Sequence, residues 1–150
     1  MIQSSKTLLT AALVCIGSLQ AYADEAMKIV SLNAGLHVIQ AEVANTFATR
    51  ALGLMHRKAM GTNRGMLFVF PAAERQCMWM RNTLLPLSVA FMDEQGAIIN
   101  IEDMHPQTET SHCALGAARY ALEMNKGWFA SRGIKPGSKV SGLDRAPDPQ

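Results

Sequence analysis

The segment from residue 65 to residue 93 constrains the fold more than any other part of this 150-residue chain. It contains three short apolar runs, at residues 66–70, 76–81 and 87–92, around one compact polar cluster. Runs of this length, bounded by turn-forming residues, are typical of strands, because a helix needs roughly ten residues or more. The segment therefore predicts a protein rich in β-structure.

The rest of the chain predicts further strands and little helix. Asn45 or Thr46 can cap a helix that continues to about residue 57, because apolar side chains recur along one face. Further strands are expected at residues 36–44, 97–102, 119–124 and near Val140, with a tight turn at 93–96, an irregular loop at 104–118 and a helical turn at 127–132. About seven short strands with one or two helices predict the class α+β, β-rich: a compact, mostly antiparallel β-barrel or sandwich.

The first residues predict export. Lys6 precedes an uncharged, apolar stretch at residues 7–19, and residues 21–23, Ala-Tyr-Ala, have the small-x-small pattern of a cleavage site. The apolar stretch is shorter than the about 20 residues of a membrane span, so residues 1–23 are predicted to be a signal peptide. We expect a periplasmic or secreted protein without an integral membrane span after cleavage.

The predicted mature chain has the size of one domain. Cleavage leaves 150 − 23 = 127 residues, enough for a single hydrophobic core. We expect a flexible segment at residues 24–31, one domain at 32–143 and a disordered tail at 144–150. Without Lys6, 13 basic and 12 acidic side chains give a net charge of +1, and they are scattered along the chain. This balance gives no support for nucleic-acid binding, and we expect a monomer.

Two cysteines, Cys77 and Cys113, remain after removal of the signal peptide. An even number in an oxidising compartment predicts a disulfide bond. The bond would close a loop of 113 − 77 + 1 = 37 residues and contribute about 4 kcal/mol of stability. A second interpretation stays open, because Cys113 follows His112 and an imidazole can activate a thiolate nucleophile.

The polar cluster that follows residue 78 is the strongest candidate for a binding site. Trp79 offers a flat apolar wall, Asn82 and Thr83 offer neutral hydrogen-bonding groups, and arginine offers a planar fork for a carboxylate or phosphate. The predicted ligand is a small polar molecule or a segment of another envelope protein. The predicted binding residues are Arg50, Arg57, Trp79, Arg81, Asn82 and Thr83.

A purely structural interpretation of the same residues stays open. Asn82 and Thr83 are ordinary turn residues that can satisfy backbone groups, and Trp79 can fill the core. The two arginines near the helix, Arg50 and Arg57, can pair with an acidic side chain. The candidates for such a pair are Glu42, Glu102 and Glu123.

Several motifs together resemble a known family. Residues 50–57 read Arg-Ala-Leu-Gly-Leu-Met-His-Arg, residues 65–68 read Gly-Met-Leu-Phe, and residues 79–83 read Trp-Met-Arg-Asn-Thr. Over about residues 36–143 the chain resembles the prokaryotic family catalogued as "domain of unknown function 192". The resemblance implies a small β-rich α+β domain, often exported, with no agreed activity, substrate or cofactor. Ser88 and Ser138 depart from the family pattern, which often has Asp at both positions.

Enzymatic function is an alternative that the residues leave open. Glu102, Asp103, His105 and His112 lie close in sequence, and a carboxylate beside an imidazole can perform acid–base chemistry in a hydrolase or transferase. The chain has no nucleophile elbow, no His-Glu-x-x-His motif and no phosphate-binding glycine loop. No catalytic residue is therefore assigned, and no cofactor is predicted.

Copper binding is a second alternative. The chain has ten methionines, and thioethers are soft ligands that suit Cu(I) in an exported protein. Met78 and Met80 would share one face of a strand. Methionine also fills irregular cores, and most of these methionines lie within apolar runs, so no metal ligand is assigned.

Overall fold

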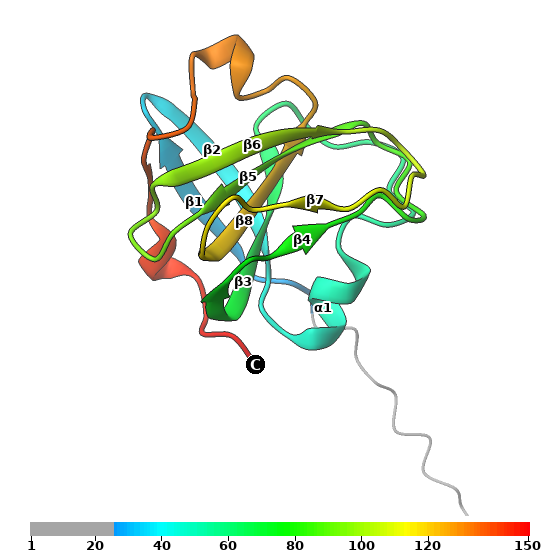
Figure 1. Cartoon of the computed structure of the whole chain (residues 1–150), viewed down its shortest axis with the longest axis horizontal. Coiled ribbons are helices and arrows are strands. Elements are labelled where there is room, and N and C mark those ends of the chain that lie inside the picture. Colours follow the sequence, from blue (N-terminus) through cyan, green and yellow to red (C-terminus); the bar gives the residue numbers. More distant parts are fainter. Residues whose placement is uncertain (1–25) are drawn as a thin grey trace, which may run out of the picture.

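The computed structural model describes residues 26–150, so the predicted signal peptide lies outside the described residues. These residues form a seven-stranded, mostly antiparallel sheet that curls into a half-barrel (Figure 1). The predicted β-rich α+β class is confirmed. The elements are β1 (Ile29–Ala34), β2 (His37–Ala44), α1 (Phe47–Leu52), β3 (Arg64–Glu74), β4 (Cys77–Met78), β5 (Leu87–Met92), β6 (Ile98–Met104), β7 (His112–Cys113), β8 (Ala118–Asn125), η1 (Ala130–Arg132), β9 (Val140–Ser141) and η2 (Leu143–Arg145).

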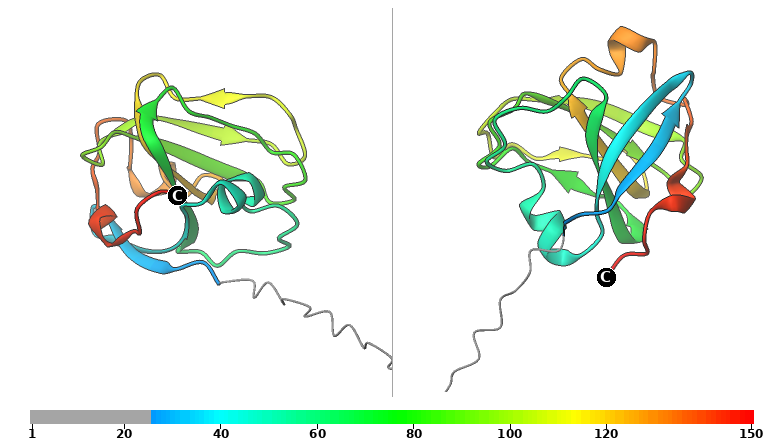
Figure 2. Two further views of the ribbon diagram at one scale, coloured as in Figure 1. Left: turned by 90° about the horizontal axis from the view of Figure 1, so that it is seen from below. Right: turned by 180° about the vertical axis from the view of Figure 1, so that it is seen from behind.

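The strand order is β6-β5-β8-β3-β2-β1-β9, which places β8 near the middle of the sheet. The pair β2–β3 is parallel, and the other pairs in this sheet are antiparallel. Parallel neighbours need a long crossover, and here residues 45–63 supply it and include α1. The crossover places α1 at one end of the half-barrel, near β4 (Figures 1 and 2).

Alternation along the strands divides the core into two clusters, one on each face of the sheet. On β8, Leu122 and Met124 face the first cluster, while Ala121 faces the second. On β3, Leu67 and Val69 alternate in the same way with Met66 and Phe68. The continuous apolar runs in the sequence therefore reflect a sheet that is covered on both faces. Glu123 lies between Leu122 and Met124 and so shares the face of Ala121.

The structure differs from the sequence-based expectation at both ends of the domain. β1 begins at Ile29, inside the segment expected to be flexible, because Val30 and Leu32 alternate with polar residues and bury one face. The tail after residue 143 contains η2, and Gln150 donates a backbone hydrogen bond to the Asn45 carbonyl at 2.7 Å. Both ends therefore contribute to the folded domain.

Element lengths in the interior also differ from expectation. β3 continues through Pro71 to Glu74, with an irregular register beyond Val69. α1 is capped by Thr46 as expected but ends at Leu52, because Gly53 and then His56 adopt positive φ angles of 50° and 63°. The run at residues 76–81 contains only the two strand residues of β4.

The short strands β4 and β7 form a second sheet, here called the β4–β7 ribbon. Cys77 and Cys113 face each other in this ribbon, and their Sγ atoms lie 2.08 Å apart, the distance of a disulfide bond. The two segments that flank the ribbon are also joined to each other, because the Met80 N–H donates to the Thr108 carbonyl at 2.9 Å. Within residues 26–150, no helix is long and apolar enough to cross a membrane.

We expect reduction of the Cys77–Cys113 pair to lower the free energy of unfolding by about 4 kcal/mol, because the open loop regains chain entropy in the unfolded state. Guanidinium unfolding with and without reductant measures the difference, and intact mass reports the loss of two hydrogens on oxidation. The double variant C77S/C113S serves as the control, since reductant should not shift its midpoint. An unfolding midpoint of the natural chain that is indifferent to reductant would contradict the bridge.

Candidate functional site

A small pocket of about 30 Å³ lies between the end of α1 and the β4–β7 ribbon. This volume accommodates about one water-sized chemical group. The crossover from β2 to β3 supplies one wall, the ribbon supplies a second, and β8 supplies the base. The lining residues are Arg50, Ala51, Leu52, Gly53, Leu54, Met55, Phe68, Met78, Trp79, Thr83 and Glu123.

The base of this pocket carries the carboxyl group of Glu123. Glu123 lies on β8 directly opposite Met66 of β3 and Val89 of β5, and only 4% of the residue is exposed. Its carboxyl makes no hydrogen bond to another residue in the described part of the chain. Burial raises the pKa of this carboxyl to about 8. At neutral pH the group is therefore mostly protonated, and it can donate as well as accept a hydrogen bond.

Thr83 and Trp79 form the polar and aromatic walls of the pocket. Thr83 is buried, and its hydroxyl donates to the Arg81 carbonyl at 3.2 Å. Trp79 is 47% exposed, so it does not fill the core, and the half-exposed Leu52 lies on the same pocket. The pocket therefore has the apolar side chains of Trp79 and Leu52 together with the mostly neutral carboxyl group of Glu123.

The two arginines of the crossover have structural partners. Arg57 binds both carboxylate oxygens of Glu42, with N···O distances of 2.6 and 2.5 Å, and hydrogen bonding to Arg57 lowers the pKa of the Glu42 carboxyl. Arg50 donates to the carbonyl oxygens of Asn45, Val69 and Gln150. Arg50 lines the pocket, but its guanidinium already binds these three carbonyl groups. Arg57 does not line the pocket.

Arg81 and Asn82 also lie outside the pocket lining. The Arg81 guanidinium lies 5.7 Å from the centre of the Trp79 ring and 3.7 Å from the carboxylate of Glu109, in an exposed pair. Asn82 adopts a left-handed conformation with φ of 53°, and its carbonyl accepts a hydrogen bond from His56. Asn82 thus shapes the turn that precedes Thr83. Of the six predicted binding residues, the structure brings Arg50, Trp79 and Thr83 together.

The sequence analysis missed Glu123 as a site residue and considered it only as a partner for arginine. One signal could have revealed it, because Glu123 is the single charged residue in the sequence Tyr-Ala-Leu-Glu-Met at 120–124. A charge in the middle of an apolar strand either pairs or serves a function. What the local sequence does not show is that β3 and β5 flank β8 and place Met66 and Val89 on either side of Glu123.

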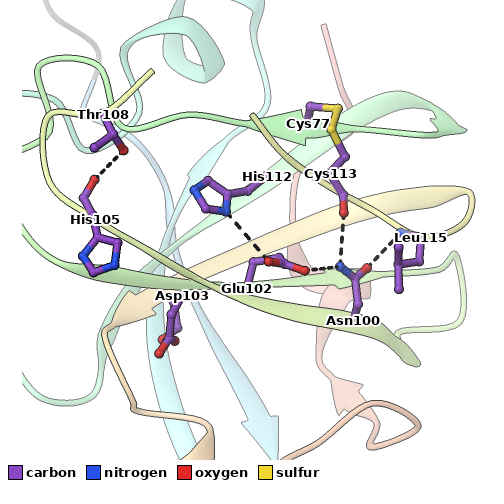
Figure 3. Close-up of polar contacts among 10 residues, drawn as sticks. Cys77, Asn100, Glu102, Asp103, His105, Thr108, His112, Cys113 and Leu115 are labelled. Carbon is purple, nitrogen blue, oxygen red and sulfur yellow. Dashed lines mark hydrogen bonds and ion pairs between the residues drawn. A yellow bond between two sulfur atoms is a disulfide. The ribbon is translucent and has the colours of Figure 1, made fainter. Parts of the chain in front are cut away.

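The acidic and histidine residues of the enzymatic alternative form a separate cluster at the ribbon (Figure 3). His112 Nδ1 lies 3.8 Å from Glu102 Oε2, and Asn100 donates to Glu102 Oε1 at 3.4 Å. Asp103 instead accepts a 2.5 Å hydrogen bond from the Ser88 hydroxyl. The backbone carbonyl of His105 accepts from Thr108. Only His112 and Glu102 of the four predicted residues therefore face each other.

The two methionines of the copper alternative have different surroundings. Met80 is fully buried in the second core cluster, whereas Met78 is half-buried and lines the pocket. Within residues 26–150, no group of three or more His, Cys, Asp or Glu side chains is arranged to hold a metal ion. Met80 therefore serves the core, as the packing interpretation expects.

Comparison with known proteins places this geometry in context. The family model DUF192, described as "Uncharacterized ACR", matches residues 28–142. A crystal structure of a protein of unknown function from Novosphingobium aromaticivorans DSM 12444 shares 34% identity, with a TM-score of 0.73, over 93% of this chain and 99% of that one. A Sinorhizobium meliloti 1021 protein, described as a candidate transcription regulator, shares 31% identity, with a TM-score of 0.72, over 79% of this chain and 96% of that one. No curated protein matches the chain.

We expect Glu123 to make the protein less stable as pH rises. Its pKa is 4.5 in the reference state and about 8 in the fold, so between these values the unfolded chain loses a proton that the folded chain retains. The carboxyl's contribution to stability is complete below about pH 4.5 and declines up to about pH 8, by up to about 5 kcal/mol. Urea unfolding of the natural chain and of Glu123→Gln, from pH 5 to pH 8, measures this difference.

The variant Glu42→Gln is the matched control for this pH series. The pKa of Glu42 is lowered in the fold, so its contribution is lost only as pH falls below about 4.5. The difference between the natural chain and Glu42→Gln should stay constant from pH 5 to pH 8. If the free energies of unfolding of the natural chain and of Glu123→Gln changed in parallel from pH 5 to pH 8, this result would contradict a raised pKa of the Glu123 carboxyl.

Proposed function

The chain belongs to the DUF192 family, whose model spans most of its length, and for this member we propose a non-catalytic binding function in the cell envelope. The proposed ligand is a small polar molecule, or a segment of another exported protein, whose polar head group enters the Glu123 pocket. The carrying observation is the carboxyl group of Glu123, a residue that is only 4% exposed, that forms no side-chain hydrogen bond among residues 26–150 and that lines a pocket. The carboxyl has little contact with water and no partner in the protein, so a ligand group in the pocket can supply a hydrogen bond that strengthens binding.

The size and lining of the pocket indicate which part of the ligand it holds. About 30 Å³ admits one hydroxyl or primary ammonium group, or the NH₂ or C=O end of an amide. Thr83 stands beside Glu123 to offer a second polar contact, while Trp79 and Leu52 provide apolar area for the neighbouring part of the ligand. Exposed aromatic side chains next to a desolvated polar anchor are typical of binding hot spots.

Export of the protein is part of the same proposal. It is supported by the signal-like pattern at residues 1–23 and by two cysteines at disulfide distance. The absence of a spanning helix among residues 26–150 is compatible with it. The charges of this chain are scattered rather than gathered in a basic patch, so they give no support for the DNA binding that a transcription regulator needs.

A second candidate function is hydrolysis or group transfer by the cluster at the ribbon. The observation that favours it is the approach of His112 Nδ1 to Glu102 Oε2 at 3.8 Å, with Asn100 orienting the carboxylate. Such a pair can exchange a proton with a substrate. Turnover of a panel of esters, amides and glycans that disappears in both Glu102→Gln and His112→Ala would favour this candidate over the binding module.

Fragment binding tests the proposed pocket. We expect methylammonium, acetamide and methanol to shift the ¹H–¹⁵N signals of Thr83 and Glu123, whereas acetate should not, because its negative charge would be buried beside a carboxyl group without a free cation to pair with it. Methylammonium should bind more tightly as pH rises toward 8, since the ion pairs with the carboxylate form and displaces its proton. Acetamide should show no such pH dependence.

Two variants of pocket residues and one variant of a neighbouring residue serve as controls for the fragment experiment. Glu123→Gln should abolish the pH dependence of methylammonium binding, and Thr83→Val should weaken all three fragments about threefold to tenfold. Arg81→Gln removes an exposed charge outside the lining and should leave the affinities unchanged. Shifts that survive Glu123→Gln with their pH dependence intact would place the ligand elsewhere.

A further inference from the structure

A second concave region lies on the face of the sheet opposite Glu123. It is a cleft of about 560 Å³ between the turn that joins β1 to β2 and the loop that follows β8. Figures 1 and 2 show this turn and this loop at the same end of the half-barrel, away from α1. The cleft is lined by Ala34, Gly35, Leu36, His37, Arg132, Gly133, Ile134, Ser138 and Lys139.

The base of the cleft is apolar and belongs to the first core cluster. Ala34 and Ile134 are both buried members of that cluster, whereas the Glu123 pocket borders the second. Leu36 stands at the rim and is 99% exposed. A Cβ atom built at Gly35 or Gly133 would meet no heavy atom within 4 Å, so the space directly beside both glycines is open. The cleft therefore has room and apolar surface for the body of a ligand.

The rim of the cleft carries cations without carboxylate partners. Among residues 26–150, neither Arg132 nor Lys139 has a carboxylate oxygen within 4.0 Å, in contrast to the Arg57–Glu42 pair. Glu94 and Lys139 both line a neighbouring hollow, but the Glu94 carboxylate does not come within 4.0 Å of the Lys139 ammonium group. The rim thus has a positive charge that the described residues do not neutralise.

Arg132 is held in position by its surroundings. Its guanidinium donates to the Trp128 carbonyl at 3.1 Å and to the Ser131 hydroxyl at 3.0 Å, and it lies 4.4 Å from the centre of the Trp128 ring. A stacked guanidinium loses little further freedom when it binds an anion. The fixed charge and the apolar base together specify a ligand with an acidic head and an apolar body.

We infer that this cleft binds an amphipathic anion, in which a carboxylate or phosphate head contacts Arg132 and Lys139 and a short hydrocarbon body covers Ile134 and Leu36. This site differs from the Glu123 pocket in position and in the charge that it selects. The same protein therefore has a pocket for a hydrogen-bonding or cationic group on one face and a cleft for an anion on the other.

Tryptophan fluorescence tests the cleft. The chain has two tryptophans, so in the variant Trp79→Phe only Trp128, which lies under Arg132, emits. We expect octanoate, kept below its micellar concentration, to shift this emission saturably and to bind less tightly as salt concentration rises. Octyl phosphate tests the other head group, and saturable binding of either anion supports the inference. Acetate lacks the body and octylammonium reverses the charge, so both should bind at least about tenfold more weakly.

Charge variants locate the bound anion. In the Trp79→Phe background, Arg132→Gln should weaken octanoate about tenfold and Lys139→Gln about threefold. Lys135→Gln removes an exposed cation of the same loop that does not line the cleft, and should have no effect. Arg132 also supports the loop, so Lys139→Gln keeps the test valid if Arg132→Gln unfolds.

Three results would overturn the inference: octylammonium binding as tightly as octanoate, no saturable response to octanoate or octyl phosphate, or equal affinities in Lys139→Gln and Lys135→Gln. The Glu123→Gln variant separates this site from the proposed function. It should leave octanoate binding unchanged, and methylammonium binding should conversely survive Lys139→Gln.

Discussion

The pairing of β8 with β3 on one side and β5 on the other is the constraint on which the rest of the structure depends. Because β8 is central, side chains on both of its faces are removed from water, and each face needs its own cover. The crossover with α1 and the β4–β7 ribbon lie beside one face, and the β1–β2 turn with the loop after β8 borders the other. Both candidate sites lie where this cover is incomplete.

Position on the central strand also explains the chemistry of Glu123. A carboxyl on an edge strand would reach water and remain an ordinary acid. Between Met66 and Val89 it has apolar neighbours on both sides, so burial dominates its pKa. The cations of the opposite cleft are in a different position, because Arg132 and Lys139 lie at the rim and keep access to water. One sheet thus presents two different electrostatic environments.

Local sequence patterns predicted much of the fold, because most strands here have their own apolar runs and turn residues. The hairpin of β5 and β6, the Thr46 cap and the facing of Cys77 and Cys113 agree with the sequence-based expectation. The early end of α1 was not predicted, since it depends on the positive φ angles at Gly53 and His56. Trp79 and Thr83 were predicted together because they are neighbours in sequence. Glu123 and the cleft depend on segments far apart in the chain, and no local pattern reports such contacts.

The position of the Cys77–Cys113 pair bears on the cost of filling the Glu123 pocket. Met78 and Trp79 follow Cys77 directly and form one wall of that pocket. A closed bridge fixes this wall when the protein folds, so the loss of conformational entropy occurs before a ligand arrives. A preorganised wall binds more tightly than one that must order on contact. On the proposed function, ligand affinity is therefore expected to depend on whether the compartment in which the chain folded allowed this bridge to close.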